Sequence, residues 1–348
     1  MLDIKLLDCT LRDGGFCNDW QFWRENIRGI FKWLVKARVD IIEIGFLDAR
    51  RPHDENRSIM PDTSSAAKIY EGLSHDTALV VGMIDYGTCP LSNVAPRAAS
   101  PLDGIRVIFK KPKLVEALRF CAALKALGYL VFVQPVSVTD YSDKELLHLA
   151  KLVNEVAPYS VSVVDTYGLL GEEELLHYVD LLHRELHRDI ALGYHAHNNL
   201  QLACANSIAV IKKAKMQEGR RTLLLDGSLS GMGKSAGNAP LELLALYLNR
   251  HEGKSYAIDG MLGLIDRHVA PFYTPPSWGY HTFYFLAAAT ACHPNYVAYL
   301  KNQGLSSAHI YVLLDRIQKE KRLAFDKAYI EELYEESGKE LLYEPLPL

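Results

Sequence analysis

The sequence lacks the features that mark secreted, membrane or nucleic-acid-binding proteins. Its six cysteines form no Cys-x-x-Cys pair, which favours free thiols in a reducing cytoplasm. No apolar run approaches the roughly 20 residues of a membrane-spanning helix, and the first five residues do not resemble a signal peptide. The net charge is −4, without a polybasic stretch or an acidic tail. We therefore expect a cytoplasmic protein whose partners include neither nucleic acid nor a membrane.

The chain does contain a regular alternation of two patterns, without internal repeats. Short apolar, β-branched runs alternate with longer stretches of helical period. Eight such units are typical of a (β/α)8 TIM barrel with a parallel sheet. The expected strands are 4–9, 41–46, 78–84, 104–109, 130–135, 160–165, 190–195 and 222–226. The clearest expected helices are 23–36, 112–127, 143–156, 172–186 and 200–213. Pro90, Pro96 and Pro101 predict little helix in the third unit.

The last quarter of the chain has a different pattern. A helix starting near Pro240 would close the barrel, and from about residue 262 the pattern is helical without strands. We therefore expect a catalytic TIM barrel over residues 1–260 and a C-terminal helical extension over residues 261–348. The terminal segment 343–348 is expected to be loosely ordered.

Reactive side chains follow the first and the seventh expected strands, at the end where TIM barrels build their active sites. The first strand leads into Arg12 and Asp13, followed by two glycines. The seventh ends at His195 and His197, which point to the same side because they are two residues apart on an extended chain. Each feature alone has a structural explanation, such as a capping aspartate or histidines that are merely hydrogen-bonded. Together they predict a site at the barrel mouth.

This combination predicts an open metal centre with Asp13, His195 and His197 as ligands. The set suits manganese, magnesium, cobalt or zinc and leaves positions for water and a chelating substrate. A 2-oxo acid would chelate through its carboxylate and keto oxygens, and the metal would stabilise the enolate. Arg12 would neutralise the enolate oxygen or the carboxylate. In the glycine-rich loop after the eighth strand, which lacks Walker A spacing, Asn238 would approach the metal or hold a histidine.

Three segments resemble the motifs of a known superfamily. TLRDGG (residues 10–15), HAHNN (195–199) and GMGKSAGNAPLE (231–242) are similar to those of the DRE-TIM metallolyases, or HMG-CoA lyase-like proteins. Within that superfamily the chain is most similar to 4-hydroxy-2-oxovalerate aldolase, through 231–242, 205–208 and 279–280. The resemblance implies a class II aldolase that makes or cleaves a carbon–carbon bond through a metal-bound pyruvate enolate, with manganese as the expected metal.

The resemblance also implies roles for individual residues. The implied metal ligands are Asp13, His195, His197 and, at a position used by some members only, Asn238. Arg12 matches the arginine that stabilises the enolate, and Glu43 matches a second-strand glutamate that supports this arginine. Thr166 stands where a small hydroxyl residue binds the substrate carboxylate. Tyr280 matches a tyrosine that reaches the site from the extension, with Tyr284 as the fallback.

One position departs from the aldolase pattern. The typical aldolase has a histidine soon after the RDG turn as catalytic base, whereas Phe16 lies near that place here. Either the acceptor differs, or another group is the base; the candidates are Asp19, His281 and a metal-bound water. For Asp19 we favour a structural interpretation as a helix N-terminal acid. Arg50 and Arg51 after the second strand are interpreted as a recognition site for an anionic acceptor or as a solvated loop.

Two other functions remain open. A Claisen-type synthase would join an acyl-CoA to the 2-oxo acid and would release free CoA. The synthases, however, carry glutamate and glutamine after the RDG turn, where this chain has Gly15 and Phe16. A non-catalytic metal-binding barrel would explain the missing histidine, but the intact arginine, aspartate and histidines argue against it.

The resemblance also bears on partners. Aldolases of this branch pass their aldehyde to an acylating aldehyde dehydrogenase through the extension. Because the extension and the acceptor end diverge here, we expect this protein not to have that partner. An aromatic-rich extension is compatible with a homodimer, and the expected ligands are a small 2-oxo acid and an aldehyde.

Overall fold

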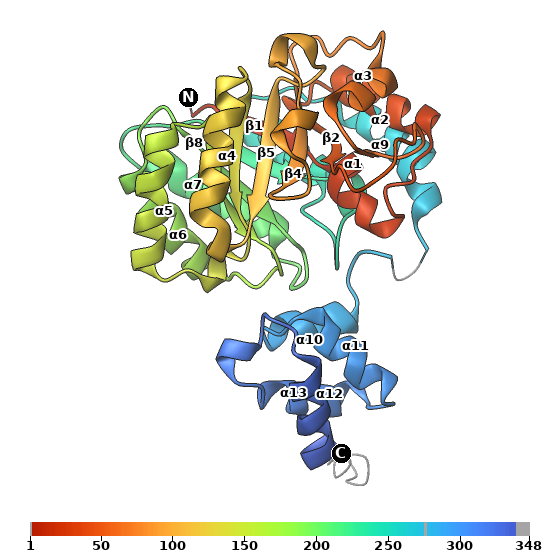
Figure 1. Cartoon of the computed structure of the whole chain (residues 1–348), viewed down its shortest axis with the longest axis vertical. Helices are drawn as coiled ribbons and strands as arrows, with labels where there is room; N and C mark the ends of the chain where they lie inside the picture. Colours follow the sequence, from red (N-terminus) through yellow and green to blue (C-terminus); the bar gives the residue numbers. More distant parts are fainter. Residues whose placement is uncertain (1, 275–276, 339–348) are drawn as a thin grey trace.

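The computed structural model describes residues 2–274 and 277–338, and within them eight parallel strands close into a barrel (Figure 1). The strands run in the order β1-β9-β8-β7-β6-β5-β4-β2, and β1 pairs with β2 to close the ring. They are β1 (Ile4–Asp8), β2 (Ile41–Leu47), β4 (Leu79–Asp85), β5 (Gly104–Phe109), β6 (Leu130–Pro135), β7 (Ser160–Asp165), β8 (Ala191–Ala196) and β9 (Leu223–Gly227). The predicted (β/α)8 barrel is confirmed. A two-residue strand, β3 (Ile59–Met60), which was not predicted, pairs with the edge of β2.

Helices lie around the barrel, and each predicted helix is present with ends shifted by at most three residues. The helices of the barrel are α2 (Arg24–Lys36), α3 (Thr63–Tyr70), α4 (Leu114–Ala126), α5 (Asp143–Val156), α6 (Glu172–Glu185), α7 (Ala203–Met216) and α8 (Leu241–His251). Pro240 is the N-cap of α8. Between β4 and β5 the chain forms only two 3-10 turns, Leu91–Asn93 and Arg97–Ala99, as the prolines predicted.

The inside of the barrel changes from apolar to polar along the strands. One layer contains alternate, inward residues from six strands: Leu7, Ile41, Val81, Phe132, Ala191 and Leu224. Because the side chains of a strand alternate between its two faces, the residues two positions further along also point inward. These include the buried polar residues Glu43, Gln134 and Asp226, and Gln134 is hydrogen-bonded to the buried Arg106 of β5 and Ser162 of β7. The apolar layer closes one end of the barrel, so polar chemistry is confined to the C-terminal ends of the strands.

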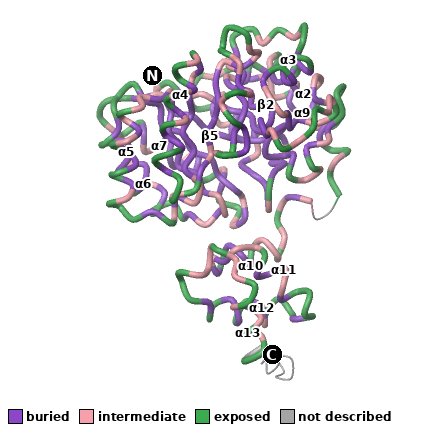
Figure 2. Tube along the Cα trace, in the orientation of Figure 1, coloured by how far each residue is buried: buried purple, intermediate pink, exposed green. Residues whose placement is uncertain are grey.

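The predicted extension has two parts. Helix α9 (Ile258–Leu264) packs on α2, and Met261, Leu264 and Trp278 belong to the core of the barrel. Helices α10 (Thr282–Ala289), α11 (Pro294–Asn302), α12 (Ser307–Asp315) and α13 (Lys327–Leu333) surround a second core of their own. Figures 1 and 2 show this helical unit beside the barrel, with its own buried interior. The tail segment 343–348 lies outside the described residues. None of the described helices has the length and apolar character needed to cross a membrane.

Gly45 lies in β2 two residues after Glu43, at an irregularity of the strand. Its φ is 138°, and the register between β2 and β4 shifts between Glu43 and Phe46. A Cβ on Gly45 would lie 1.8 Å from the carbonyl oxygen of Ser58. We therefore expect Gly45→Ala to lower the free energy of unfolding by about 3 kcal/mol, because backbone overlap and an unfavourable φ act together.

Urea unfolding measures this effect, with Gly263→Ala as the matched control. Gly263 lies in α9, where an added Cβ would meet no atom within 4 Å. The control is expected to leave stability unchanged or to raise it by about 0.5–1 kcal/mol, because alanine favours helix more than glycine does. Equal unfolding midpoints for both variants would contradict the prediction.

Candidate metal centre

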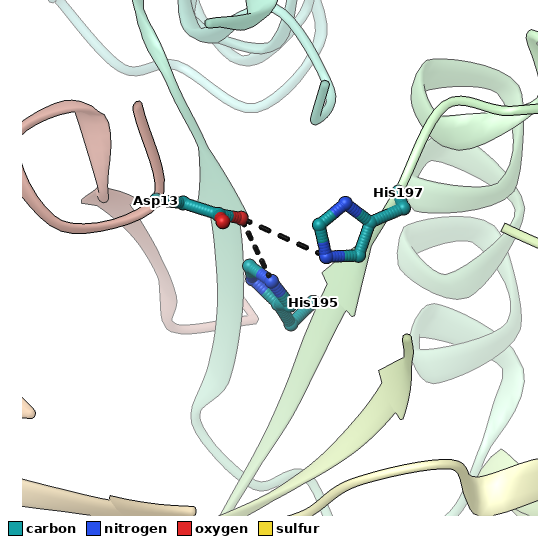
Figure 3. Close-up of side chains that lie close together, drawn as sticks. All are labelled: Asp13, His195 and His197. Carbon is teal, nitrogen blue, oxygen red and sulfur yellow. Dashed lines mark ion pairs between the residues drawn. The ribbon is translucent and has the colours of Figure 1, made fainter. Parts of the chain in front are cut away.

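Asp13, His195 and His197 meet at the C-terminal end of the barrel (Figure 3). Asp13 ends α1 (Thr10–Asp13), which follows β1; His195 lies in β8, and His197 follows that strand. Oδ2 of Asp13 is 3.4 Å from Nε2 of His195 and 3.7 Å from Nε2 of His197. All three side chains are buried, and Figure 3 shows both imidazoles turned toward the carboxylate. The structure thus brings together the three residues predicted as ligands.

The other ring nitrogen of each histidine is held by the protein. Nδ1 of His195 donates to Oδ2 of Asp226 over 2.9 Å, and Nδ1 of His197 donates to the carbonyl oxygen of Lys234 over 3.2 Å. With Nδ1 as donor, each Nε2 presents a lone pair toward Asp13. This arrangement, in which an outer hydrogen bond fixes the ring and its tautomer, is the usual one for metal-binding histidines.

Unsatisfied oxygens show that the site fits a cation. Both carboxylate oxygens of Asp13 and Oδ1 of Asn238 are buried and accept no hydrogen bond. The backbone of Asn238 pairs with that of His197, which places the amide beside the three ligands. A buried acceptor without a partner is costly. A divalent metal among carboxylate, imidazole and amide oxygen ligands would remove this cost.

Arg12 is held beside the ligands by a chain of buried ion pairs. Its Nη1 lies 3.3 Å from Oδ1 of Asp13, and its Nε donates to Oε2 of Glu43 over 2.8 Å. Arg106 donates from Nη1 to the same Glu43 oxygen over 2.9 Å, and from Nη2 to Asp226. Asp226 in turn holds His195. The contact expected between Glu43 and Arg12 is present, and one buried network joins Arg12 to a predicted metal ligand.

The electrostatics of the cluster hold Asp13 and His197 in the protonation states that a metal needs. Burial raises the pKa of Asp13, but Arg12 and His197 outweigh burial and hold this pKa well below its usual range. Burial lowers the pKa of His197 to about 4, so this ring is neutral at neutral pH. For His195, the carboxylates of Asp13 and Asp226 outweigh burial and raise the pKa. An ionised carboxylate and a neutral imidazole therefore already face each other.

The site opens into a small cavity of about 80 Å³. Thr166 lines it, as expected for a residue near the substrate, and its Oγ1 accepts a hydrogen bond of 2.7 Å from the backbone of Ser137. Phe16 and Phe46 form an apolar part of the wall, with ring centroids 6.2 Å apart. Lys234 also lines the cavity and has a lowered pKa, chiefly because of burial.

Comparison with known proteins agrees with these observations. Residues 108–262 match the family model described as HMGL-like. This part of the chain is thus similar to HMGL-like proteins. The chain is 28% identical over 257 residues to 4-hydroxy-2-oxovalerate aldolase 3 of Rhodococcus jostii, which covers 69% of this chain and 69% of that protein. It is 27% identical over 259 residues to an oxaloacetate decarboxylase of Mycobacterium tuberculosis, covering 73% and 72% of the two chains.

Solved structures share the fold of this chain. The N-terminal domain of a candidate aldolase from Bacteroides vulgatus superposes with a TM-score of 0.68 at 24% identity, covering 84% of this chain and 95% of that one. HMG-CoA lyase from Bacillus subtilis gives a TM-score of 0.62 at 16% identity, covering 78% and 93%. The predicted resemblance to the DRE-TIM metallolyases and to 4-hydroxy-2-oxovalerate aldolase is confirmed.

Three predicted residues of the extension do not line the cavity at the metal ligands. Tyr280 is 61% exposed and does not line the cavity at the metal ligands. Tyr284 is partly buried, and its pKa is raised by burial and by nearby Cys17, but it does not line that cavity either. His281 accepts a hydrogen bond from the backbone of Phe283 and caps α10. A catalytic role for Tyr280 stays a prediction.

The structure corrects the interpretation of Asp19, whereas Arg50 and Arg51 lie in an exposed loop, one of the two alternatives left open. Asp19 is not a helix N-terminal acid, because α2 begins only at Arg24. Its carboxylate instead forms ion pairs with Arg51 and Arg57. Arg50 pairs with Asp48 over 2.6 Å. These ion pairs connect the loops at the mouth of the barrel. Asp19 and the three arginines are thus each in an ion pair with another protein side chain.

Four polar residues of the site were missed by the sequence analysis: Arg106, Gln134, Asp226 and Lys234. The first three occupy alternate positions in otherwise apolar strands. A charged residue at an inward position of a barrel strand needs buried partners, and that was the available signal. Lys234 belongs to the glycine-rich loop, whose sequence does not reveal which side chain turns inward.

Proposed function

We propose that this protein is a divalent-metal-dependent carbon–carbon lyase of the 4-hydroxy-2-oxo acid aldolase type. The observation that carries the proposal is the carboxylate of Asp13 facing Nε2 of His195 and of His197, with the guanidinium of Arg12 beside it. The match of residues 108–262 to the HMGL-like family model supports lyase chemistry in general. The aldolase relatives support the finer assignment, since their names describe an aldolase that acts on a 4-hydroxy-2-oxo acid.

In the proposed reaction a 2-oxo acid lies in the cavity between Arg12 and Thr166. Manganese, or another divalent cation held by Asp13 and the two histidines with Asn238 beside them, supplies Lewis acidity when bound. Arg12 stabilises negative charge on the keto oxygen as the bond at C3 breaks, and Glu43 keeps its guanidinium in place. Thr166 contacts the substrate carboxylate. The apolar wall restricts water and strengthens these interactions.

One observation also favours a second candidate, the decarboxylation of a 2-oxo dicarboxylate. Apart from the proposed ligands, the titratable groups that line the cavity are Arg12 and Lys234, both cations. Aldol cleavage needs a base for the acceptor hydroxyl, whereas loss of carbon dioxide produces the same enolate without one. The relative in Mycobacterium tuberculosis is named an oxaloacetate decarboxylase, which fits this candidate.

The proposal is tested by the exchange of the methyl protons of pyruvate with deuterium, followed by NMR. We expect exchange with the manganese-loaded protein and its loss after treatment with a chelator, because enolate formation needs the Lewis acid. The absence of exchange in metal-replete protein would reject the proposed function. Faster release of carbon dioxide from oxaloacetate than cleavage of any 4-hydroxy-2-oxo acid would replace the aldolase by the decarboxylase.

A further inference from the structure

A second, larger cavity of about 610 Å³ adjoins the metal site on the side of the helical extension. Its walls come from the loops after β5, β6 and β7 and from residues 319–324 of the extension. Val136 lines both cavities, and Thr166 of the first is followed in the chain by Tyr167 of the second. The two cavities are therefore neighbours at Val136, and a ligand held at the metal centre has the second cavity next to it.

Three basic groups from different elements lie near one another beside the two cavities. Lys234 lines the metal cavity, and Lys110, directly after β5, lines the second cavity. His293, the N-cap of α11, packs its ring against Tyr167 with centroids 5.9 Å apart. Burial and the charges of Lys234 and Lys110 lower the pKa of His293. Burial lowers the pKa of Lys234, Asp13 opposes this, and the charges of Arg12 and Lys110 lower the pKa further.

These basic groups have little compensation from acidic side chains. Within the described part of the chain neither Lys110 nor Lys234 forms an ion pair, and Nζ of Lys234 has the ring of Phe16 at 5.4 Å as its neighbour. Two carboxylates, Asp140 and Glu320, also line the second cavity. Asp140, however, interacts with Lys111, which is itself paired with Glu145 over 3.0 Å. Among the described residues, two lysines that line the second cavity therefore have no ion-pair partner: Lys110, at the end that meets the metal site, and Lys319, on the side of the extension.

We propose that the acceptor half of the substrate carries an anionic group, a phosphate or a carboxylate, which is bound by Lys110, Lys234 and His293. The inference rests on the proposed function, because a pyruvate half at the metal centre directs the rest of the substrate toward the second cavity. An anion would form charge-assisted hydrogen bonds with the two lysines, neither of which is in an ion pair, and would accept a hydrogen bond from the imidazole. The substrate class is thus a 4-hydroxy-2-oxo acid with a second anionic end.

Matched pairs of aldehydes test this inference with the manganese-loaded full chain and pyruvate. Glyceraldehyde 3-phosphate is compared with glyceraldehyde, and succinate semialdehyde with butanal, by kcat/KM for aldol addition. We expect the anionic member to be preferred by about 10-fold or more, as for charge-assisted contacts. The pair with the larger preference distinguishes a phosphate site from a carboxylate site.

Variants assign the preference to these basic groups. Lys110→Gln is expected to reduce the preference for the anionic aldehyde about 10-fold and to weaken inhibition by inorganic phosphate by a similar factor. Lys113→Gln is the matched control, because Lys113 is exposed, lies outside both cavities and has Glu116 at 3.8 Å. The control should keep the preference and the inhibition of the wild type.

The outcomes separate the two proposals, since the exchange of pyruvate protons needs no acceptor. No exchange would reject the proposed function and the inference with it. Exchange together with equal rates for neutral and anionic aldehydes, or with no addition to any of the four aldehydes, would overturn the inference alone. Equal inhibition of Lys110→Gln and Lys113→Gln by phosphate would also overturn it.

Discussion

Arg12→Gln is expected to lower the rate of metal-dependent pyruvate proton exchange by about 10²–10³-fold, as removal of an oxyanion-stabilising donor does in other enzymes. Arg12 is 5% exposed and is the cation nearest to Asp13, at 3.3 Å. Burial lowers the pKa of its guanidinium, but Glu43 and Asp13 outweigh burial and raise it, so the charge is permanent. Glutamine keeps part of the side-chain length and removes this charge. NMR of pyruvate in deuterium oxide measures the rate.

Two further variants test whether the effect is local. Arg24→Gln removes a surface arginine that pairs with Glu55 and should exchange like the wild type. Arg12→Lys keeps the charge but loses the Nε–Glu43 hydrogen bond, and we expect a rate between those of wild type and Arg12→Gln. Circular dichroism confirms that each variant is folded. If Arg12→Gln binds manganese and exchanges within about 3-fold of wild type, Arg12 does not stabilise the enolate.

The barrel was predictable from the sequence because its strands are buried on both faces. β2 and β7 are buried at every residue, so their apolar runs stand out against the helical period around them. The lack of an α-helix between β4 and β5 was also predictable from local sequence, because three prolines lie in that segment. By contrast, β3 has two residues and depends on pairing with Phe46 and Leu47 of β2. A strand of that length has no periodicity that a sequence can show.

The metal cluster was predictable because a barrel brings the C-terminal ends of its strands to one mouth. Asp13 and the two histidines are adjacent to strand ends, so chain position alone predicts that they meet. The hydrogen-bond network behind the ligands depends on how the strands are aligned across the barrel. Asp226 in β9 accepts hydrogen bonds from Arg106 in β5 and from His195 in β8. No local pattern specifies that convergence.

The extension was the least predictable part, because its contacts depend on how one unit packs on another. The motif placed Tyr280 in the site, yet this side chain is largely exposed and lies outside the metal cavity. His293, which no motif singled out, packs on Tyr167 at the second cavity. Helical periodicity alone does not indicate which residues of the extension will contact the barrel.

Asp13→Asn is expected to abolish manganese binding, measured by isothermal titration and by the shift of the melting temperature. In wild type, metal at about 100 times its Kd should stabilise the fold by about 2.7 kcal/mol, because it binds the native state alone. The amide has nearly the shape of the carboxylate but lacks the negative charge that faces both Nε2 atoms. We therefore expect no stabilisation of this variant by manganese.

Two other aspartates make this result specific. Asp226 does not face the metal but holds Nδ1 of His195, so Asp226→Asn is expected to weaken manganese binding by about 10–100-fold without abolishing it. Asp48 is buried to a similar degree and pairs with Arg50, away from the cluster, so Asp48→Asn should bind like the wild type. Manganese affinity is therefore expected to fall in the order Asp48→Asn, Asp226→Asn, Asp13→Asn. Asp48 lies away from the cluster, Asp226 contacts only Nδ1 of His195, and Asp13 faces both Nε2 atoms. Wild-type affinity in Asp13→Asn would mean that the buried carboxylate and histidines are only a hydrogen-bonded cluster, and that the enolate chemistry proposed here has no Lewis acid to support it.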